Sequence, residues 1–237
     1  MTLAIPLSRS ARHKALIRPL FDECVAVETC DPQADPPSPF PEEAACLSAN
    51  AVQKRRHEFA AGRAAAHQAM ASLGTEPSAI LVGPKRAPIW PAGLVGSISH
   101  CSSAAIAVLA LPRQMRGLGV DVEEDTPLAD DLVPQICRPA EREWLKKQNN
   151  PGQLAKVIFS AKEAAYKCQY RLSECFFGFD GMELEMTVAQ GTDQLTGQFC
   201  ARFTSDRPPF QQGDTIEGRF AVGEGLIATA AQLPQVR

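Results

Sequence analysis

Two acidic residues in one short segment are the first feature that could do chemistry. Asp121 and Glu123 are two residues apart in Gly119-Val120-Asp121-Val122-Glu123. Apolar and acidic residues alternate here, which predicts a strand that projects both carboxylates from one face. Such oxygen ligands suit Mg²⁺, which proteins hold through one or two carboxylates plus substrate phosphates. The alternative is a solvated strand end that binds nothing.

A second pair, Glu163 and Lys167, lies on a predicted helix. The two residues are four apart in the segment 159–167, so their side chains share a face. A carboxylate beside an ammonium could serve as a base and a phosphate clamp. The alternative is a surface salt bridge worth about 0.3–0.5 kcal/mol.

Ser99 and His100 end a segment of small residues at 96–100. A strand that ends in this way can present a hydroxyl, backbone N–H groups and an imidazole to an anion. A Ser/His hydrolase is the alternative, although no G-x-S-x-G elbow accompanies these residues.

Basic residues form the fourth feature. Arg55 and Arg63 are eight residues apart, or about two helical turns, so both could face one ligand. Lys85 and Arg86 follow in a separate segment. Arginine suits phosphate because its planar fork donates two hydrogen bonds. A charged helix face in water is the alternative.

The elements that hold these residues can be predicted from periodicity and turn residues. Helices are expected over 42–73, stopped by Gly74, and over 140–170, broken at 149–152. Strands are expected over 94–111, bent at 100–102, and over 117–123, 182–188, 197–204, 216–222 and 226–233. A proline-rich surface loop is expected over 31–41. This order predicts an α+β fold of two similar halves, residues 1–115 and 116–237, with a ligand cleft where they meet.

Bulk composition limits the class of protein. The chain has 237 residues, 45% of them hydrophobic, and a net charge of -3, so nothing global indicates nucleic-acid binding. It has no apolar run of the roughly 20 residues that span a bilayer, and its start lacks signal-peptide features. Eight cysteines without a C-x-x-C pair predict reduced core thiols. We expect a cytoplasmic protein without membrane contact.

Taken in order, these motifs resemble the phosphopantetheinyl transferases. The resemblance covers roughly residues 55–167. Within the family, the sequence is most similar to the large Sfp-type branch, which includes the siderophore-type enterobactin synthase component D. The segments that carry it are 62–66, 86–93, 96–100, 119–123 and 159–167. Phe159 stands where many members of the family have Trp.

The resemblance implies a monomer of two pseudo-symmetric halves, with coenzyme A and Mg²⁺ between them. The N-terminal half would bind the nucleotide end, and the C-terminal half would carry the metal and catalytic residues. Asp121, Glu123 and Glu163 would hold the metal, and Glu163 and Lys167 would be catalytic. The residues that would bind coenzyme A are Arg55, Arg63, Lys85, Arg86, Pro88, Ser99, His100, Asp121 and Lys167.

The implied activity moves 4'-phosphopantetheine from coenzyme A to a serine of an apo acyl or peptidyl carrier protein and releases 3',5'-ADP. The carrier could serve fatty-acid, polyketide or peptide synthesis, and the metal could be Mg²⁺ or Mn²⁺. Glu163 could take the serine proton directly or through a water. The alternatives are a metal-dependent nuclease and a non-catalytic module that binds coenzyme A or a carrier protein. We expect Asp121→Ala to abolish transfer and leave the fold intact.

Overall fold

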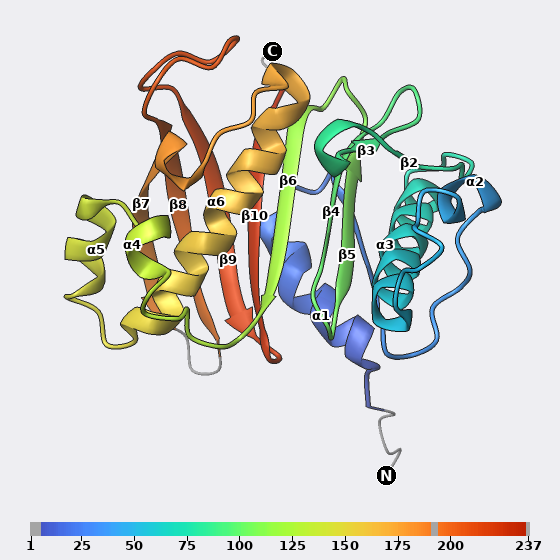
Figure 1. The fold of residues 1–237 in the computed structure, drawn as a ribbon, viewed down its shortest axis with the longest axis horizontal. Helices are drawn as coiled ribbons and strands as arrows, with labels where there is room; N and C mark the ends of the chain where they lie inside the picture. Colours follow the sequence, from blue (N-terminus) through green and yellow to red (C-terminus); the bar gives the residue numbers. More distant parts are fainter. Residues whose placement is uncertain (1–5, 191–193, 236–237) are drawn as a thin grey trace.

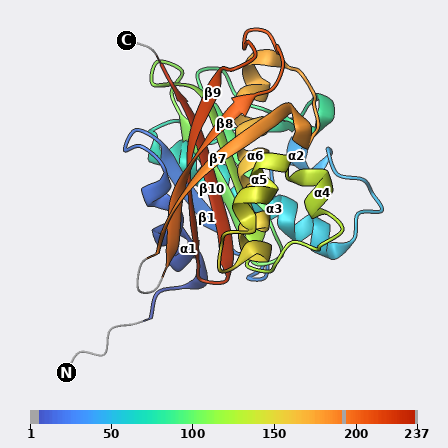
Figure 2. The same cartoon turned by 90° about the vertical axis from the view of Figure 1, so that its left-hand side faces the viewer.

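The computed structural model describes residues 6–190 and 194–235 and has an α+β fold (Figure 1). Two antiparallel sheets lie side by side, and a long helix packs on each. The predicted fold class is therefore confirmed. Figure 2 shows α1 on one face of the sheets and the long helices α3 and α6 on the other.

The first sheet has three strands in the order β1-β5-β4. Their bounds are Ala26–Cys30 for β1, Val95–His100 for β4 and Ala105–Ala110 for β5. Helix α3, Gln53–Ser72, packs on this sheet through small residues such as Ala65, Ala66 and Ala69. Helix α1, Arg9–Ile17, packs on the other face, where Leu16 and Ile17 join the core.

The second sheet has five strands in the order β6-β10-β9-β8-β7. Their bounds are Met115–Glu124, Met182–Gln190, Leu195–Phe203, Thr215–Gly223 and Leu226–Pro234 for β6 to β10. Helix α6, Pro151–Ser173, lies along β6 and β10 (Figure 1). Its buried face, which includes Val157, Ile158 and Ala161, packs against aromatic residues of the sheet such as Phe199 and Phe220.

Serine side chains join the two sheets where β4 runs beside β6. The hydroxyl of Ser97 accepts a hydrogen bond from the Val120 N–H at 3.1 Å, and that of Ser99 accepts one from the Val122 N–H at 3.4 Å. A buried backbone N–H needs a hydrogen-bond acceptor. Here serine hydroxyls take the place of the backbone carbonyls that would accept these hydrogen bonds between strands of one sheet. We call this β4–β6 line the seam.

The remaining elements are short. They are α2 Pro41–Ala44, β2 Leu81–Val82, β3 Pro88–Ile89, α4 Val133–Ile136, α5 Pro139–Leu145 and 3₁₀ turns at Arg18–Leu20, Pro84–Arg86 and Phe179–Gly181.

Most predicted elements are confirmed within one or two residues, including the bend after His100 and the break before α6. The single helix predicted over 42–73 is wrong, because α2 ends at Ala44 and α3 begins at Gln53. Between them the Asn50 N–H donates to the Ser48 hydroxyl, a local turn that competes with the helix. Helix α1 and strand β1 were not predicted.

The division at residue 115 stays a prediction. One core cluster combines Val27 and Val108 of the first sheet with Val120 and Ala228 of the second, so the halves share apolar packing. All eight cysteines are described and are free thiols, although only Cys137 and Cys168 are buried. Across residues 6–190 and 194–235, the chain has no helix of the length and apolar character that crossing a membrane requires.

Candidate active site

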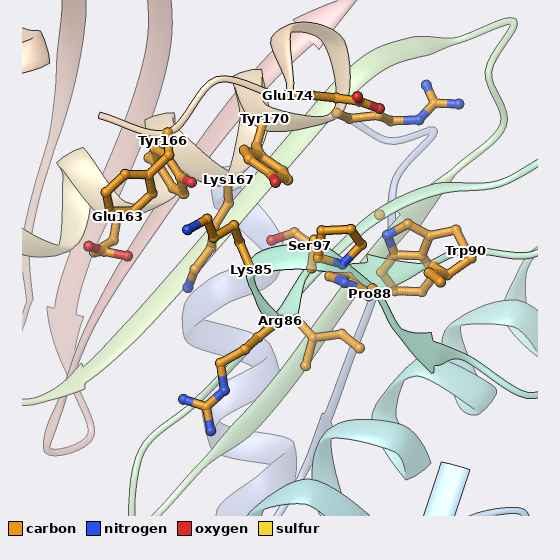
Figure 3. Close-up of a pocket in the computed structure, with 18 residues that line it drawn as sticks. Lys85, Arg86, Pro88, Trp90, Ser97, Glu163, Tyr166, Lys167, Tyr170 and Glu174 are labelled. Atoms are coloured by element: carbon orange, nitrogen blue, oxygen red, sulfur yellow. The ribbon is translucent and has the colours of Figure 1, made fainter. Parts of the chain in front are cut away.

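Two adjoining cavities lie along the seam. The larger, about 660 Å³, is lined by residues 83–90, by β4 and by one face of α6; we call it the central cavity. Figure 3 shows Glu163, Tyr166 and Lys167, which enter it from α6, together with Lys85 and Arg86 of the loop at 83–90. The second, about 600 Å³, is lined by the chain before α3, by α3 itself and by the end of β4; we call it the side cavity. Arg86, Pro88 and Ile98 line both cavities.

Glycines in β6 allow α6 to lie directly against the seam. A Cβ at Gly119 would lie 1.9 Å from the Ala164 carbonyl oxygen, and one at Gly117 would lie 2.4 Å from the Cys168 carbonyl oxygen. Real Cβ atoms do not approach this closely, so any side chain there would push the helix away. The glycines next to the acidic motif therefore bring Glu163 and Lys167 of α6 close to it.

Asp121 lies at the centre of a hydrogen-bond network on β6. Its side chain is 6% exposed, and its Oδ1 lies 2.6 Å from the Lys167 ammonium. Oδ1 also accepts from the Ser99 hydroxyl at 2.9 Å, and Oδ2 accepts from the Ser160 hydroxyl at 2.8 Å. Ser160 in turn contacts the Thr229 hydroxyl of β10 at 2.9 Å. Both carboxylate oxygens are thus fixed by neighbouring elements.

Lys167 pairs with Asp121, and its ammonium also donates to the Val120 carbonyl and the Ser99 hydroxyl, each at 3.1 Å. The surface salt bridge between Glu163 and Lys167, our structural alternative, does not form. In the described part of the chain, Glu163 has no hydrogen-bond or salt-bridge partner. Burial raises the pKa of Glu163; Lys167 opposes the rise, and Asp121 and Glu123 add to it.

Glu123, the second acid of β6, faces a different lysine. Its Oε2 lies 2.8 Å from the ammonium of Lys156, which precedes Glu163 on α6 by seven residues, or about two helical turns. Lys156, Ser160, Glu163 and Lys167 follow one another at spacings of four, three and four, so they form one stripe on the helix. This stripe faces the two acids of β6.

The donor chemistry of the three acids fits Mg²⁺. Asp121 and Glu123 both act on the pKa of Glu163, so the three carboxylates are within electrostatic reach of one another. Carboxylate oxygens are the ligands this ion prefers. Among the described residues no group of three or more His, Cys, Asp or Glu side chains is gathered for a metal, and lysines pair with two of the three acids. The predicted convergence on one cation stays a prediction.

His100 is a neutral imidazole in this structure. Its Nε2 lies 2.7 Å from Nη1 of Arg55, and a guanidinium can only donate, so Nε2 accepts. Burial lowers the pKa of His100 to about 4, with Arg55 and Lys167 adding to the effect. His100, Arg55 and Arg63 all line the side cavity.

Arg63 is a buried cation whose hydrogen bonding is incomplete. It is 6% exposed, and its Nε has no hydrogen-bond partner. The guanidinium lies over the Phe59 ring at 4.4 Å and 3.7 Å from the carboxylate of Glu43, which is fully buried. Burial lowers the pKa of Arg63, and Glu43 opposes this shift. Arg63 also lines the side cavity.

The loop at Lys85 and Arg86 holds a costly backbone conformation. Both residues have positive φ, 52° and 65°, a region that costs non-glycine residues about 1–2 kcal/mol each. The Lys85 ammonium lies 5.4 Å from the Phe176 ring centre across the central cavity, and Arg86 lies where the two cavities meet. The conformation therefore directs two positive charges to the cavities.

Comparison with known proteins identifies the family. Residues 42–110 match the 4'-phosphopantetheinyl transferase N-terminal domain, and residues 117–217 match the 4'-phosphopantetheinyl transferase superfamily. The chain belongs to this superfamily.

Characterised transferases are similar over most of the chain. 4'-phosphopantetheinyl transferase Svp of Streptomyces mobaraensis is 39% identical over 81% of this chain and 77% of its own length. PptT of Mycobacterium tuberculosis is 36% identical over 84% of this chain and 89% of its own length. Enterobactin synthase component D of Salmonella typhi is 42% identical over half of each chain. The recognised resemblance is confirmed, and the nuclease and binding-module alternatives are set aside.

The structure adds residues of the transferase that sequence reasoning did not single out. Ser160 donates to Asp121 and contacts Thr229, Glu43 accompanies Arg63, and Lys156 pairs with Glu123. Ser160 and Lys156 could have been found from helical spacing, because they precede Glu163 by three and seven residues. The role of Ser99 in binding coenzyme A stays a prediction; in the structure its hydroxyl contacts the Asp121 carboxylate, the Lys167 ammonium and the Val122 N–H.

Proposed function

We propose that this transferase moves the 4'-phosphopantetheine arm of coenzyme A onto a serine of an apo carrier protein at the seam, with 3',5'-ADP as the leaving product. One observation carries the placement. Glu163 is a half-buried carboxylate with a raised pKa and no partner among the described residues, and it faces the central cavity beside Lys167. A general base needs a free carboxylate in such a position.

The side cavity would receive the nucleotide end of coenzyme A. Arg55, Arg63 and Arg86 line it, and planar guanidinium groups match the geometry of a phosphate such as the 3'-phosphate. Lys85 and Pro88 belong to the loop at its edge, which continues into the central cavity. The neutral His100 orients Arg55, because its Nε2 accepts a hydrogen bond from that guanidinium.

The reacting phosphate would lie between Lys167 and the acidic residues. Mg²⁺, or Mn²⁺, held by Asp121, Glu123 and Glu163 would supply positive charge for the pyrophosphate and its leaving group. Glu163 takes the proton from the carrier serine, directly or through a water. The serine oxygen then forms a bond to the β-phosphorus, and the bond from that phosphorus to the oxygen of departing 3',5'-ADP breaks. Lys167 neutralises charge on the phosphates.

All residues of the proposed site come from one chain, which supports our proposal that the transferase acts as a monomer. Half of the chain is similar to enterobactin synthase component D, and this favours testing siderophore carriers alongside fatty-acid and polyketide carriers.

The experiment is incubation of the purified protein with each apo carrier, coenzyme A and Mg²⁺ or Mn²⁺. Intact-mass spectrometry should show one added phosphopantetheine, and fragmentation should place it on the acceptor serine. A carrier with that serine changed to alanine is the matched control. If no carrier in the panel gained mass with either metal, the proposal would be wrong.

A further inference from the structure

Lys156 is the charged member of the α6 stripe that the proposed reaction does not use. Its ammonium lies 2.8 Å from Oε2 of Glu123, and its side chain is only 17% exposed against 27% for Glu123. Its charge also lies 5.3 Å from the centre of the Phe159 ring. The pair is therefore largely enclosed, unlike the exposed ion pair of Lys146 with Glu143, whose side chains are 69% and 65% exposed.

The charges along the stripe are nearly balanced without any ligand. Asp121 and Glu123 each pair with one ammonium, from Lys167 and Lys156 respectively, and Glu163 alone is unmatched. A divalent cation would have to compete with these ammonium groups for the same carboxylates. Repulsion between an ammonium and a dication at short range is strong where water is partly excluded.

We propose that Lys156 is the internal counter-ion of Glu123 and weakens divalent-cation binding until coenzyme A is present. It is a positioning residue, because it acts through Glu123. The pyrophosphate supplies negative charge and further oxygen ligands that offset the ammonium. The enzyme then binds its metal mainly together with the donor. This inference rests on the proposed function, which assigns Glu123 to the metal.

The experiment measures Mn²⁺ affinity by electron paramagnetic resonance titration of the full chain without donor. Lys156→Met keeps the length and apolar contact of the stem and removes the charge. We expect it to bind Mn²⁺ roughly tenfold more tightly or better than the wild type. Lys156→Arg should remain close to the wild type, since it keeps the charge. Lys146→Met, which breaks the exposed pair, is the matched control and should leave the affinity unchanged.

Repeating the titration with coenzyme A and no carrier should reduce the difference between Lys156→Met and the wild type. A purely structural salt bridge predicts no gain in affinity: its loss would leave Mn²⁺ binding unchanged or make it weaker. Either result in a folded Lys156→Met protein would overturn the inference, and Lys156→Gln gives the same test if Lys156→Met does not fold. The transfer assay on the wild type separates the two proposals. If the wild type transfers phosphopantetheine but Lys156→Met binds Mn²⁺ with unaltered affinity, only the role of Lys156 is refuted.

Discussion

Replacing Asp121 with alanine removes the carboxylate that ties β6 to α6 and β4. The side chain is 6% exposed and accepts hydrogen bonds from Lys167, Ser99 and Ser160. Removing one partner of a fully buried ion pair costs about 3–5 kcal/mol, and an unsatisfied buried polar group costs about 1–3 kcal/mol. Lys167 is 27% exposed and keeps its hydrogen bond to the Val120 carbonyl, which reduces the loss of folding free energy. We therefore expect a loss of about 2–4 kcal/mol.

This value revises the expectation that the fold would be unaffected. For a chain of this size, 1 kcal/mol shifts the melting temperature by about 2–4 °C, so the variant should melt roughly 4–16 °C below the wild type. Thermal denaturation followed by circular dichroism measures the shift. Asp130→Ala is the control, because Asp130 is exposed, and its change should be within about 0.5 kcal/mol.

Asp121→Asn separates stability from activity. The amide keeps the size of the side chain and can still accept from Ser160, so it should be more stable than the alanine variant. Transfer to an apo carrier should be lost in both, because both lack the charge. An Asp121→Ala protein as stable as the wild type would refute the network, and wild-type transfer would remove Asp121 from the site.

Three further predictions concern the donor site. Arg63→Ala and Arg86→Ala should raise the KM for coenzyme A more than they lower kcat. Both variants should also reduce the enzyme's preference for coenzyme A over 3'-dephospho-coenzyme A. If the preference between these two donors were unchanged, neither arginine would bind the 3'-phosphate. Lys167→Ala should weaken both donor affinity and transfer rate, whereas Lys167→Arg should recover part of each, and equal loss in the two variants would show that charge is not what matters. Because the pKa of His100 is lowered to about 4 from 6.5, the unfolded chain binds more protons between these values, and stability should fall by about 2–3 kcal/mol as pH drops through that window. His100→Gln should lose most of that dependence in denaturant titrations at pH 4 and 7, and an unchanged dependence would contradict the assignment.

The local elements of the site could be predicted from sequence because local rules determine them. Alternation of acidic and apolar residues indicated β6, and the four-residue spacing of Glu163 and Lys167 placed both on one face of α6. Turn residues before Pro151 separated α5 from α6. In each case the signal lies within a few residues of the feature.

Pairings across the chain could not be predicted in this way. Lys167 lies four residues from Glu163 but pairs with Asp121, 46 residues away, because α6 packs on the glycines of β6. The Ser97 and Ser99 hydroxyls replace the backbone ladder at the seam, a choice that depends on how far apart β4 and β6 lie. The buried Glu43 beside Arg63 lies on α2, which the turn at Ser48 separates from α3, and the helical pattern concealed that turn.

Glu163→Gln tests whether Glu163 is the base of the transfer. The amide keeps the size of the side chain but cannot accept the serine proton. The paired measurements are the single-turnover transfer rate to an apo carrier and the calorimetric affinity for coenzyme A with Mg²⁺. We predict a rate about 10²–10⁴-fold below the wild type, with coenzyme A still bound. A rate close to the wild type would show that Glu163 is not the base.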